Sequence, residues 1–119
     1  MRILIVDDAA AERAILAHIV RDLGHDVAAE ASDVPSALEA AKERGLDLAA
    51  VDGRLPSGGC LAAVRALRGA HPGIVLIVIA ALGEIDLVRE AVTNGAAGAF
   101  RRPLLRSQVE AALHALTRP

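Results

Sequence analysis

The stretch ILIVDDAAAE (residues 3–12) decides how the rest of the sequence is interpreted. It begins with four apolar residues, Ile3 to Val6, a run that is typical of a strand buried on both faces. It then places two adjacent carboxylates, Asp7 and Asp8, directly after that run. A buried strand that ends in two negative charges indicates a site at its carboxyl end.

Five short apolar runs predict five strands, at residues 2–6, 26–30, 46–51, 74–80 and 96–100. Apolar residues at helical spacing predict five helices, whose stripes span 15–23, 34–41, 61–67, 85–92 and 105–116. Strands that are almost continuously apolar and alternate with helices are typical of a parallel sheet covered on both faces. The pattern therefore predicts an α/β fold: a flavodoxin-like, doubly wound (βα)5 sandwich with strand order 2-1-3-4-5, forming one domain over residues 1–119.

The ends of the predicted helices carry their own signals. Ser32 or Asp33 is expected to cap the second helix, because either side chain can accept a hydrogen bond from a free backbone N–H, and Pro35 falls in its first turn. Gly24 stands where the first helix should stop, and Asn94-Gly95 where the fourth should stop.

Composition excludes several classes of protein. Of the 119 residues 54% are hydrophobic, but Phe100 is the only aromatic residue, so the core has to be built from Leu, Ile, Val and Ala. A net charge of -2 gives no electrostatic footprint for nucleic acid. Cys60 stands alone, so no intrachain disulfide forms, and no apolar run reaches the length of a membrane span. We therefore expect a cytoplasmic protein that binds neither nucleic acid nor membrane.

A third carboxylate, Asp52, follows the third predicted strand. In the predicted order the first and third strands are neighbours, so Asp7, Asp8 and Asp52 meet at one edge of the sheet. Two unit charges about 4 Å apart repel by roughly 4 kcal/mol at an effective dielectric constant near 20, so such a cluster holds a proton or binds a cation. Mg²⁺ combines carboxylate with phosphate oxygens, which indicates phosphoryl chemistry. For a single residue the alternative is structural: Asp8 as a helix cap, or Asp52 as the start of a turn.

Three stretches carry a resemblance to a known family: ILIVDD (3–8), LDLAAVDGRLPSGG (46–59) and NGAAGAFRRPL (94–104). Together with the five-fold β/α alternation, they make the chain resemble the receiver domain of two-component response regulators over essentially its whole length. The aspartate pair, Asp52 with Pro56 four residues on, and the basic residue before Pro103 are specific in combination.

The resemblance implies a role for each matching residue. Asp52 matches the phosphoacceptor, a nucleophile that takes a phosphoryl group from the phosphohistidine of a histidine kinase or phosphotransfer protein. Asp7 and Asp8 match the acidic pair that holds Mg²⁺ together with Asp52, with Asp8 expected as the direct ligand. Arg54 stands where the family uses a backbone carbonyl as a further metal ligand. The domain is thus expected to be a signalling module that catalyses only its own phosphorylation and dephosphorylation, and not an enzyme.

Three positions depart from the family pattern. Ala80 stands where receivers have Thr or Ser, so a hydroxyl bond to a phosphoryl oxygen, worth about 1.5–3 kcal/mol, is lost, while the amide of Ala81 remains a donor. Arg102 stands where receivers carry Lys. Its guanidinium can grip the phosphoryl group, pair with Asp52 and block it, or swing out to solvent. Ala99 occupies the position of the aromatic switch residue of many receivers.

In the family pattern, a hydroxyl at the position of Ala80 and an aromatic side chain at the position of Ala99 form the two ends of a relay that responds to the phosphoryl group. Both ends are missing in this sequence. Phe100 is expected to point to the opposite face of its strand and pack in the core, and Arg101 to face away from the site. We expect Asp52 still to be phosphorylated, at an altered rate or with an altered lifetime. The structural response is then small or travels by another route.

The main alternative is a pseudo-receiver, the same fold used as a protein-binding module without phosphorylation. A haloacid-dehalogenase-type phosphatase is disfavoured because residues 9 and 10 are alanines where a second acid is needed, and a dinucleotide-binding fold because the first turn lacks glycines. By resemblance, an output domain or target protein would dock on the fourth helix, fifth strand and fifth helix, and a homodimer is an open alternative. Candidate residues on that face are Arg89, Glu90, Asn94, Arg101, Arg106 and Gln108.

Overall fold

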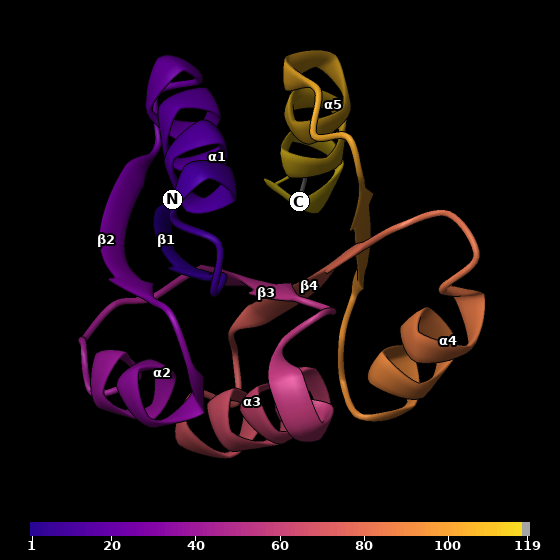
Figure 1. The fold of residues 1–119 in the computed structure, drawn as a ribbon. Coiled ribbons are helices and arrows are strands. Elements are labelled where there is room, and N and C mark those ends of the chain that lie inside the picture. Colours follow the sequence, from indigo (N-terminus) through magenta and orange to yellow (C-terminus); the bar gives the residue numbers. More distant parts are fainter. Residues whose placement is uncertain (118–119) are drawn as a thin grey trace.

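A computed structural model describes residues 1–117, so the last two residues of the predicted domain lie outside it. Its five strands form one parallel sheet in the order β2-β1-β3-β4-β5, which confirms the predicted fold (Figure 1). The strands are β1 (Arg2–Val6), β2 (Asp26–Ala31), β3 (Leu48–Asp52), β4 (Val75–Ala80) and β5 (Gly98–Arg101).

Helices cover both faces of the sheet. They are α1 (Ala10–Asp22), α2 (Val34–Ala40), α3 (Gly59–Ala70), α4 (Ile85–Thr93) and α5 (Arg106–Thr117). Figure 1 shows α1 and α5 on one side of the sheet and α2, α3 and α4 on the other. In the part of the chain that the structure describes, no helix is long and apolar enough to cross a membrane.

The alternation of side chains along each strand supplies two cores. In β3, Leu48 and Ala50 pack towards α1 and α5, in a cluster that includes Phe100. Ala49 and Val51 pack on the other face, in a cluster with α2, α3 and α4. Phe100 is buried as predicted, and burial on both faces explains why the three central strands, β1, β3 and β4, are almost continuously apolar.

Two helix starts settle alternatives that the sequence leaves open. Asp33, and not Ser32, caps α2: its Oδ1 accepts the Ser36 N–H at 2.8 Å, and the Ser36 hydroxyl accepts the Asp33 N–H. The N-cap of α1 is Ala9, without a side-chain cap bond, so Asp8 is not a helix cap. The side chain of Asp8 is therefore not needed to start α1.

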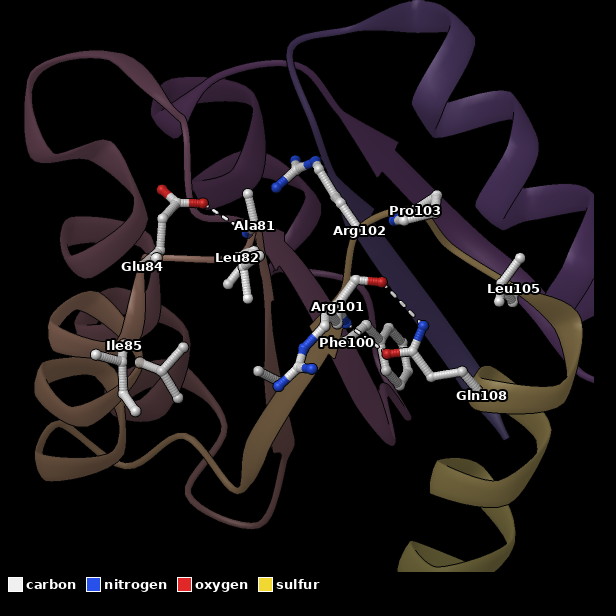
Figure 2. Close-up of a pocket in the computed structure, with 14 residues that line it drawn as sticks. Ala81, Leu82, Glu84, Ile85, Phe100, Arg101, Arg102, Pro103, Leu105 and Gln108 are labelled. Atoms are coloured by element: carbon white, nitrogen blue, oxygen red, sulfur yellow. Dashed lines mark hydrogen bonds between the residues drawn. The ribbon is translucent and has the colours of Figure 1, made fainter.

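A groove of about 800 Å³ opens between α4 and α5, over β5 (Figure 2). Large apolar side chains along it are exposed, among them Leu82, Ile85 and Leu105. Ala80 and Ala99 line the groove. The small side chains at these two positions leave it open where a larger residue would occupy part of its volume.

Gly53 follows Asp52 at a point where the backbone passes close to its neighbours. Its N–H donates to the Ile79 carbonyl at 2.8 Å. A Cβ at residue 53 would lie 2.6 Å from Cδ2 of Leu87 and 2.8 Å from the Ile79 oxygen, closer than real Cβ atoms approach. The absence of a side chain at residue 53 therefore allows the chain to pass close to β4 directly after Asp52.

We predict that Gly53→Ala lowers the free energy of unfolding by about 1–3 kcal/mol, because the added methyl forces the backbone apart. Urea unfolding followed by circular dichroism measures this. The matched control is Gly69→Ala in α3, where an added Cβ meets nothing within 4 Å and should stabilise by about 0.5–1 kcal/mol. Equal stability of Gly53→Ala and the unmodified protein would contradict the close approach.

Candidate functional site

Two carboxylates are buried at the carboxyl edge of the sheet. Asp7 follows β1 and Asp52 ends β3, and these strands are paired in the sheet. Each residue is only 1% exposed. Within residues 1–117 they are the only fully buried charged residues, so this edge is where the fold bears the cost of burying charge.

Glu12, in the first turn of α1, adds a third carboxylate to this edge. Asp7, Glu12 and Asp52 each offer an oxygen, and these oxygens all lie within 4.8 Å of one another. Carboxylate oxygens are the ligands that Mg²⁺ prefers, so the donor set fits this ion. Glu12 is not among the residues predicted from the sequence, although an acid in the first turn of the helix that leaves this edge is a usable signal.

Asp8, predicted as the direct metal ligand, lies outside the group of three carboxylates. Its side chain is exposed. It still interacts with the Asp52 carboxyl, and that interaction contributes to lowering the pKa of Asp52. The metal roles of Asp8 and of the Arg54 carbonyl stay predictions, because no contact in the structure tests them.

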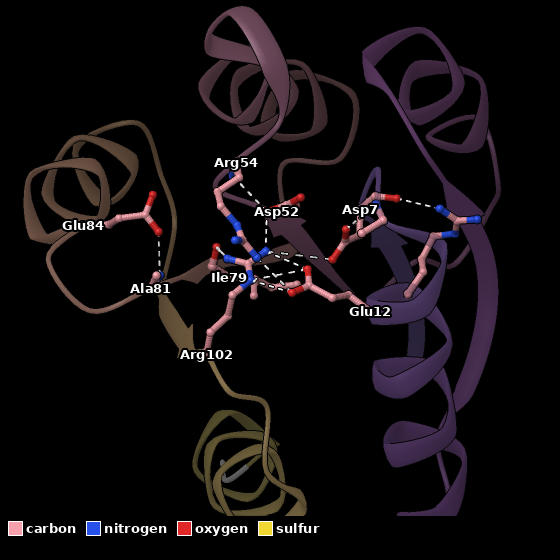
Figure 3. Close-up of polar contacts among 10 residues, drawn as sticks. Asp7, Glu12, Asp52, Arg54, Ile79, Ala81, Glu84 and Arg102 are labelled. Atoms are coloured by element: carbon pink, nitrogen blue, oxygen red, sulfur yellow. Dashed lines mark hydrogen bonds and ion pairs between the residues drawn. The ribbon is translucent and has the colours of Figure 1, made fainter.

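The Arg102 guanidinium lies among the three acids (Figure 3). Its Nη2 donates to Oδ1 of Asp52, its Nε donates to Oε1 of Glu12 at 3.1 Å, and its Nη1 donates to the Ile79 carbonyl at 2.9 Å. Its Nη2 also lies 4.0 Å from Oδ2 of Asp7, and its side chain is only 10% exposed. Of the three alternatives for Arg102, the structure has the pairing with Asp52.

The charges at this edge act strongly on one another. Burial raises the pKa of Asp7 to about 7, and the nearby charges of Asp52 and Glu12 add to this effect. Burial also opposes ionisation of Asp52, but the Arg54 N–H, 2.8 Å from its Oδ1, and the Arg102 guanidinium outweigh it and hold the pKa below its ordinary value. Asp52 is therefore ionised at neutral pH, as a carboxylate nucleophile must be.

Hydrogen bonds to Arg102 likewise lower the pKa of Glu12. Burial would lower the pKa of Arg102, but its bonds to Glu12 and Asp52 raise it instead. The guanidinium and the two carboxylates it contacts thus stabilise each other's charged forms.

The remaining predicted positions surround this group. Ala80 is buried at the end of β4, and the next N–H, of Ala81, donates to Oε1 of Glu84 at 2.6 Å. Pro56 opens a 3-10 turn after β3, and Pro103 follows Arg102 through a cis peptide bond. The side chains of residues 99 and 101, Ala99 and Arg101, are exposed, as expected from the strand alternation around Phe100.

Comparison with known proteins decides the family. The family model described as the response regulator receiver domain matches residues 3–114 of this chain. The chain belongs to the response regulator receiver family. Its carboxylate edge is therefore the site edge of a receiver domain in two-component signalling, and the acidic group Asp7, Glu12 and Asp52 fits a phosphorylation site.

Relatives of this receiver domain occur alone and within longer proteins. It is 33% identical over 117 residues to the chemotaxis protein CheY of Thermotoga maritima, with 98% of each chain covered. It is 30% identical to the transcriptional regulatory protein ZraR of Escherichia coli O157:H7, with 93% of this chain but 25% of ZraR covered. Among solved structures, the receiver domain of NtrX from Brucella abortus aligns with a TM-score of 0.86 at 29% identity, covering 98% of this chain and 99% of that one.

We predict that Asp7→Asn stabilises the receiver domain at pH 8 by about 2–4 kcal/mol in the absence of Mg²⁺. Between pH 3.8 and about 7 the folded state keeps a proton on Asp7 that the unfolded chain has released, so the contribution of this group to stability falls as pH rises through that window. The Asn oxygen can still accept the Ala9 N–H that Oδ1 of Asp7 accepts at 2.8 Å.

The measurement is the unfolding free energy of both proteins in urea from pH 4 to pH 8, with EDTA present. The difference between them should be small near pH 4 and grow until about pH 7. A difference that stays constant over this range would show that Asp7 does not carry the raised pKa.

Proposed function

We propose that this receiver domain accepts a phosphoryl group on Asp52 from the phosphohistidine of a histidine kinase or phosphotransfer protein. A carboxylate oxygen of Asp52 attacks phosphorus, the P–N bond to the imidazole breaks, and the departing nitrogen keeps the electron pair and takes a proton. The observation that carries the proposal is the Asp52 carboxylate, which is ionised although buried and lies beside further acids at the carboxyl edge of a receiver fold.

Mg²⁺, when bound, would neutralise charge on the phosphoryl oxygens, and we assign it to Asp7, Asp8, Asp52 and the Arg54 carbonyl. Arg102 takes the role that Lys has in other receivers. Its guanidinium already contacts an Asp52 oxygen, so it lies where a charge-assisted donor to the phosphoryl group is needed. In this proposal the domain is a cytoplasmic switch that acts on no substrate besides its own aspartyl phosphate.

The groove between α4 and α5 supports the proposed docking of an output domain or target protein on this face. It combines exposed apolar side chains, such as Leu82 and Ile85, with a polar edge at Arg101. Gln108 fixes that edge, because it accepts the Arg101 N–H at 2.5 Å and donates to the Arg101 carbonyl at 2.9 Å (Figure 2). A partner with one apolar anchor side chain fits such a surface.

One observation favours the pseudo-receiver as a second candidate function. Arg102 binds an oxygen of Asp52 and so occupies the ionised nucleophile in the resting domain. In that case the groove would bind its partner whether or not phosphate is supplied. The two candidates differ in whether Asp52 gains a phosphoryl group, which intact mass measures directly.

We predict that incubation with acetyl phosphate and Mg²⁺ adds the mass of one phosphoryl group, and that Asp52→Asn, which keeps the shape of the side chain, abolishes the gain. Removing Mg²⁺ with EDTA should abolish it as well, because the phosphoryl charge is then uncompensated. Folding of the variant is checked by circular dichroism. A folded, unmodified protein that gains no mass would favour the pseudo-receiver.

We predict that Ala80→Thr tightens binding of trifluoroberyllate, a phosphoryl analogue, about tenfold in the presence of Mg²⁺. A hydroxyl at residue 80 restores one hydrogen bond to a charged group, worth about 1.5–3 kcal/mol. The matched control is Ala80→Val, which has nearly the same shape without the hydroxyl. Titration followed by ¹⁹F NMR gives both affinities, and equal affinities would remove Ala80 from the phosphoryl site.

A further inference from the structure

Arg102, which the proposed function assigns to the phosphoryl group, and the Ala81 N–H, which the sequence leaves as a donor beside it, are already bonded to carboxylates of this chain. The Arg102 guanidinium donates to Glu12, from Nε at 3.1 Å and from Nη2 at 3.2 Å. The Ala81 N–H donates to Oε1 of Glu84 at 2.6 Å. In both cases a carboxylate oxygen occupies the donor in the resting domain (Figure 3).

The bonds to Glu12 come from two arginines. Besides Arg102, the Nη2 of Arg54 donates to Oε1 of Glu12 at 2.9 Å. A single carboxylate held between two guanidiniums has the arrangement that also suits a phosphoryl group, because Arg binds both anions through the same fork of donors. Glu12 is 30% exposed and lines a second pocket, of about 460 Å³, together with Arg54, Ala81 and Arg102. It therefore has space to move away.

Glu84 is placed to move as well. It lies at the N-cap of α4, makes no side-chain cap bond to that helix, and reaches back to the Ala81 N–H instead. It also lines the 800 Å³ groove between α4 and α5. A change in the partner of the Ala81 N–H would therefore change the edge of the groove.

We propose that Glu12 and Glu84 are internal substitutes for phosphoryl oxygens, which occupy Arg102, Arg54 and the Ala81 N–H until Asp52 is phosphorylated. The phosphoryl group then takes over these donors, and the two glutamates are released. This inference rests on the proposed function for the identity of the incoming group. Glu12 and Glu84 act through the donors they occupy, so they are positioning residues.

The exchange supplies a route for the signal that avoids the two missing ends of the usual relay. Release of Glu12 frees the first turn of α1 from Arg102 and Arg54, which lie on other elements. Release of Glu84 frees the segment between β4 and α4, next to the groove. Neither step needs a hydroxyl at residue 80 or an aromatic side chain at residue 99.

The group of three carboxylates gives Glu12 a competing role as a metal ligand. The two roles have opposite consequences. If Glu12 holds Mg²⁺, its removal weakens binding of a phosphoryl analogue that needs the ion. If Glu12 occupies the donors of the phosphoryl group, its removal strengthens that binding.

The experiment measures the affinity for trifluoroberyllate, with Mg²⁺ present, by ¹⁹F NMR titration. The variants are Glu12→Gln/Glu84→Gln and each single change, all checked for folding by amide NMR spectra. The control Asp26→Asn/Asp86→Asn also removes two negative charges, but at exposed positions outside the site. It therefore measures the effect of net charge alone on the affinity. We expect at least tenfold tighter binding by the double glutamine variant than by this control. Equal or weaker binding overturns the proposal.

A second readout separates this proposal from the proposed function. Intact mass after acetyl phosphate treatment tests acceptance of phosphate by the unmodified protein. Mass gain without tighter binding by the double variant leaves the proposed function standing and overturns the internal substitutes. Tighter binding by the double variant without mass gain in the unmodified protein shows that the glutamates occupy donors of the phosphoryl analogue, but it overturns the proposed function and with it the release of the glutamates on phosphorylation.

Discussion

The contact between the Arg102 guanidinium and the Asp52 carboxylate is the interaction on which the site depends. Parallel strands bring Asp7 and Asp52 to one edge of the sheet, where both are buried. Two charges at that spacing in a poorly solvated place repel by several kcal/mol, at roughly 4 kcal/mol for a separation near 4 Å. The fold resolves the conflict in two ways: Arg102 keeps Asp52 ionised, and the pKa of Asp7 rises to about 7.

Arginine makes this arrangement possible where lysine would not. The Arg102 guanidinium contacts Glu12 of α1, Asp52 of β3 and the Ile79 carbonyl of β4 at the same time. An ammonium group is a compact point charge and does not span acceptors on three elements in one plane. Arg102 therefore does more than supply the positive charge that Lys would supply. Its guanidinium links the first turn of α1 to the ends of β3 and β4.

The fold was predictable from the sequence because its signals are local. Runs such as Ile3–Val6 and the helical stripes fix the kind of each element, and the rule for parallel strands fixes which ends meet. The meeting of Asp7 and Asp52 followed from the predicted flavodoxin-like order, in which β1 and β3 are neighbours. Element ends were less certain, as with Ser32 against Asp33, because both residue types cap helices and only the backbone geometry selects one.

The side-chain contacts of the site were not predictable in the same way. Three conformations of Arg102 were compatible with the sequence, because its long side chain reaches acceptors on several elements and only the packed structure selects among them. Glu12 was missed because its role depends on the direction in which α1 leaves the sheet. The exposure of Asp8 follows from the turn after β1, where strand alternation no longer governs which side chain points inward.

Ala80, Ala99 and Arg102 together change which elements contact one another around Asp52. Ala80 and Ala99 remove side chains from the β4 and β5 side of the site and leave a groove there. Arg102, Glu12 and Arg54 add contacts on the α1 side. In the proposed exchange, a change in charge at Asp52 is coupled to the start of α1 through these bonds, for which a new anion can compete. The proposed exchange thus gives the receiver fold a connection from Asp52 to α1 that needs neither a hydroxyl at residue 80 nor an aromatic side chain at residue 99.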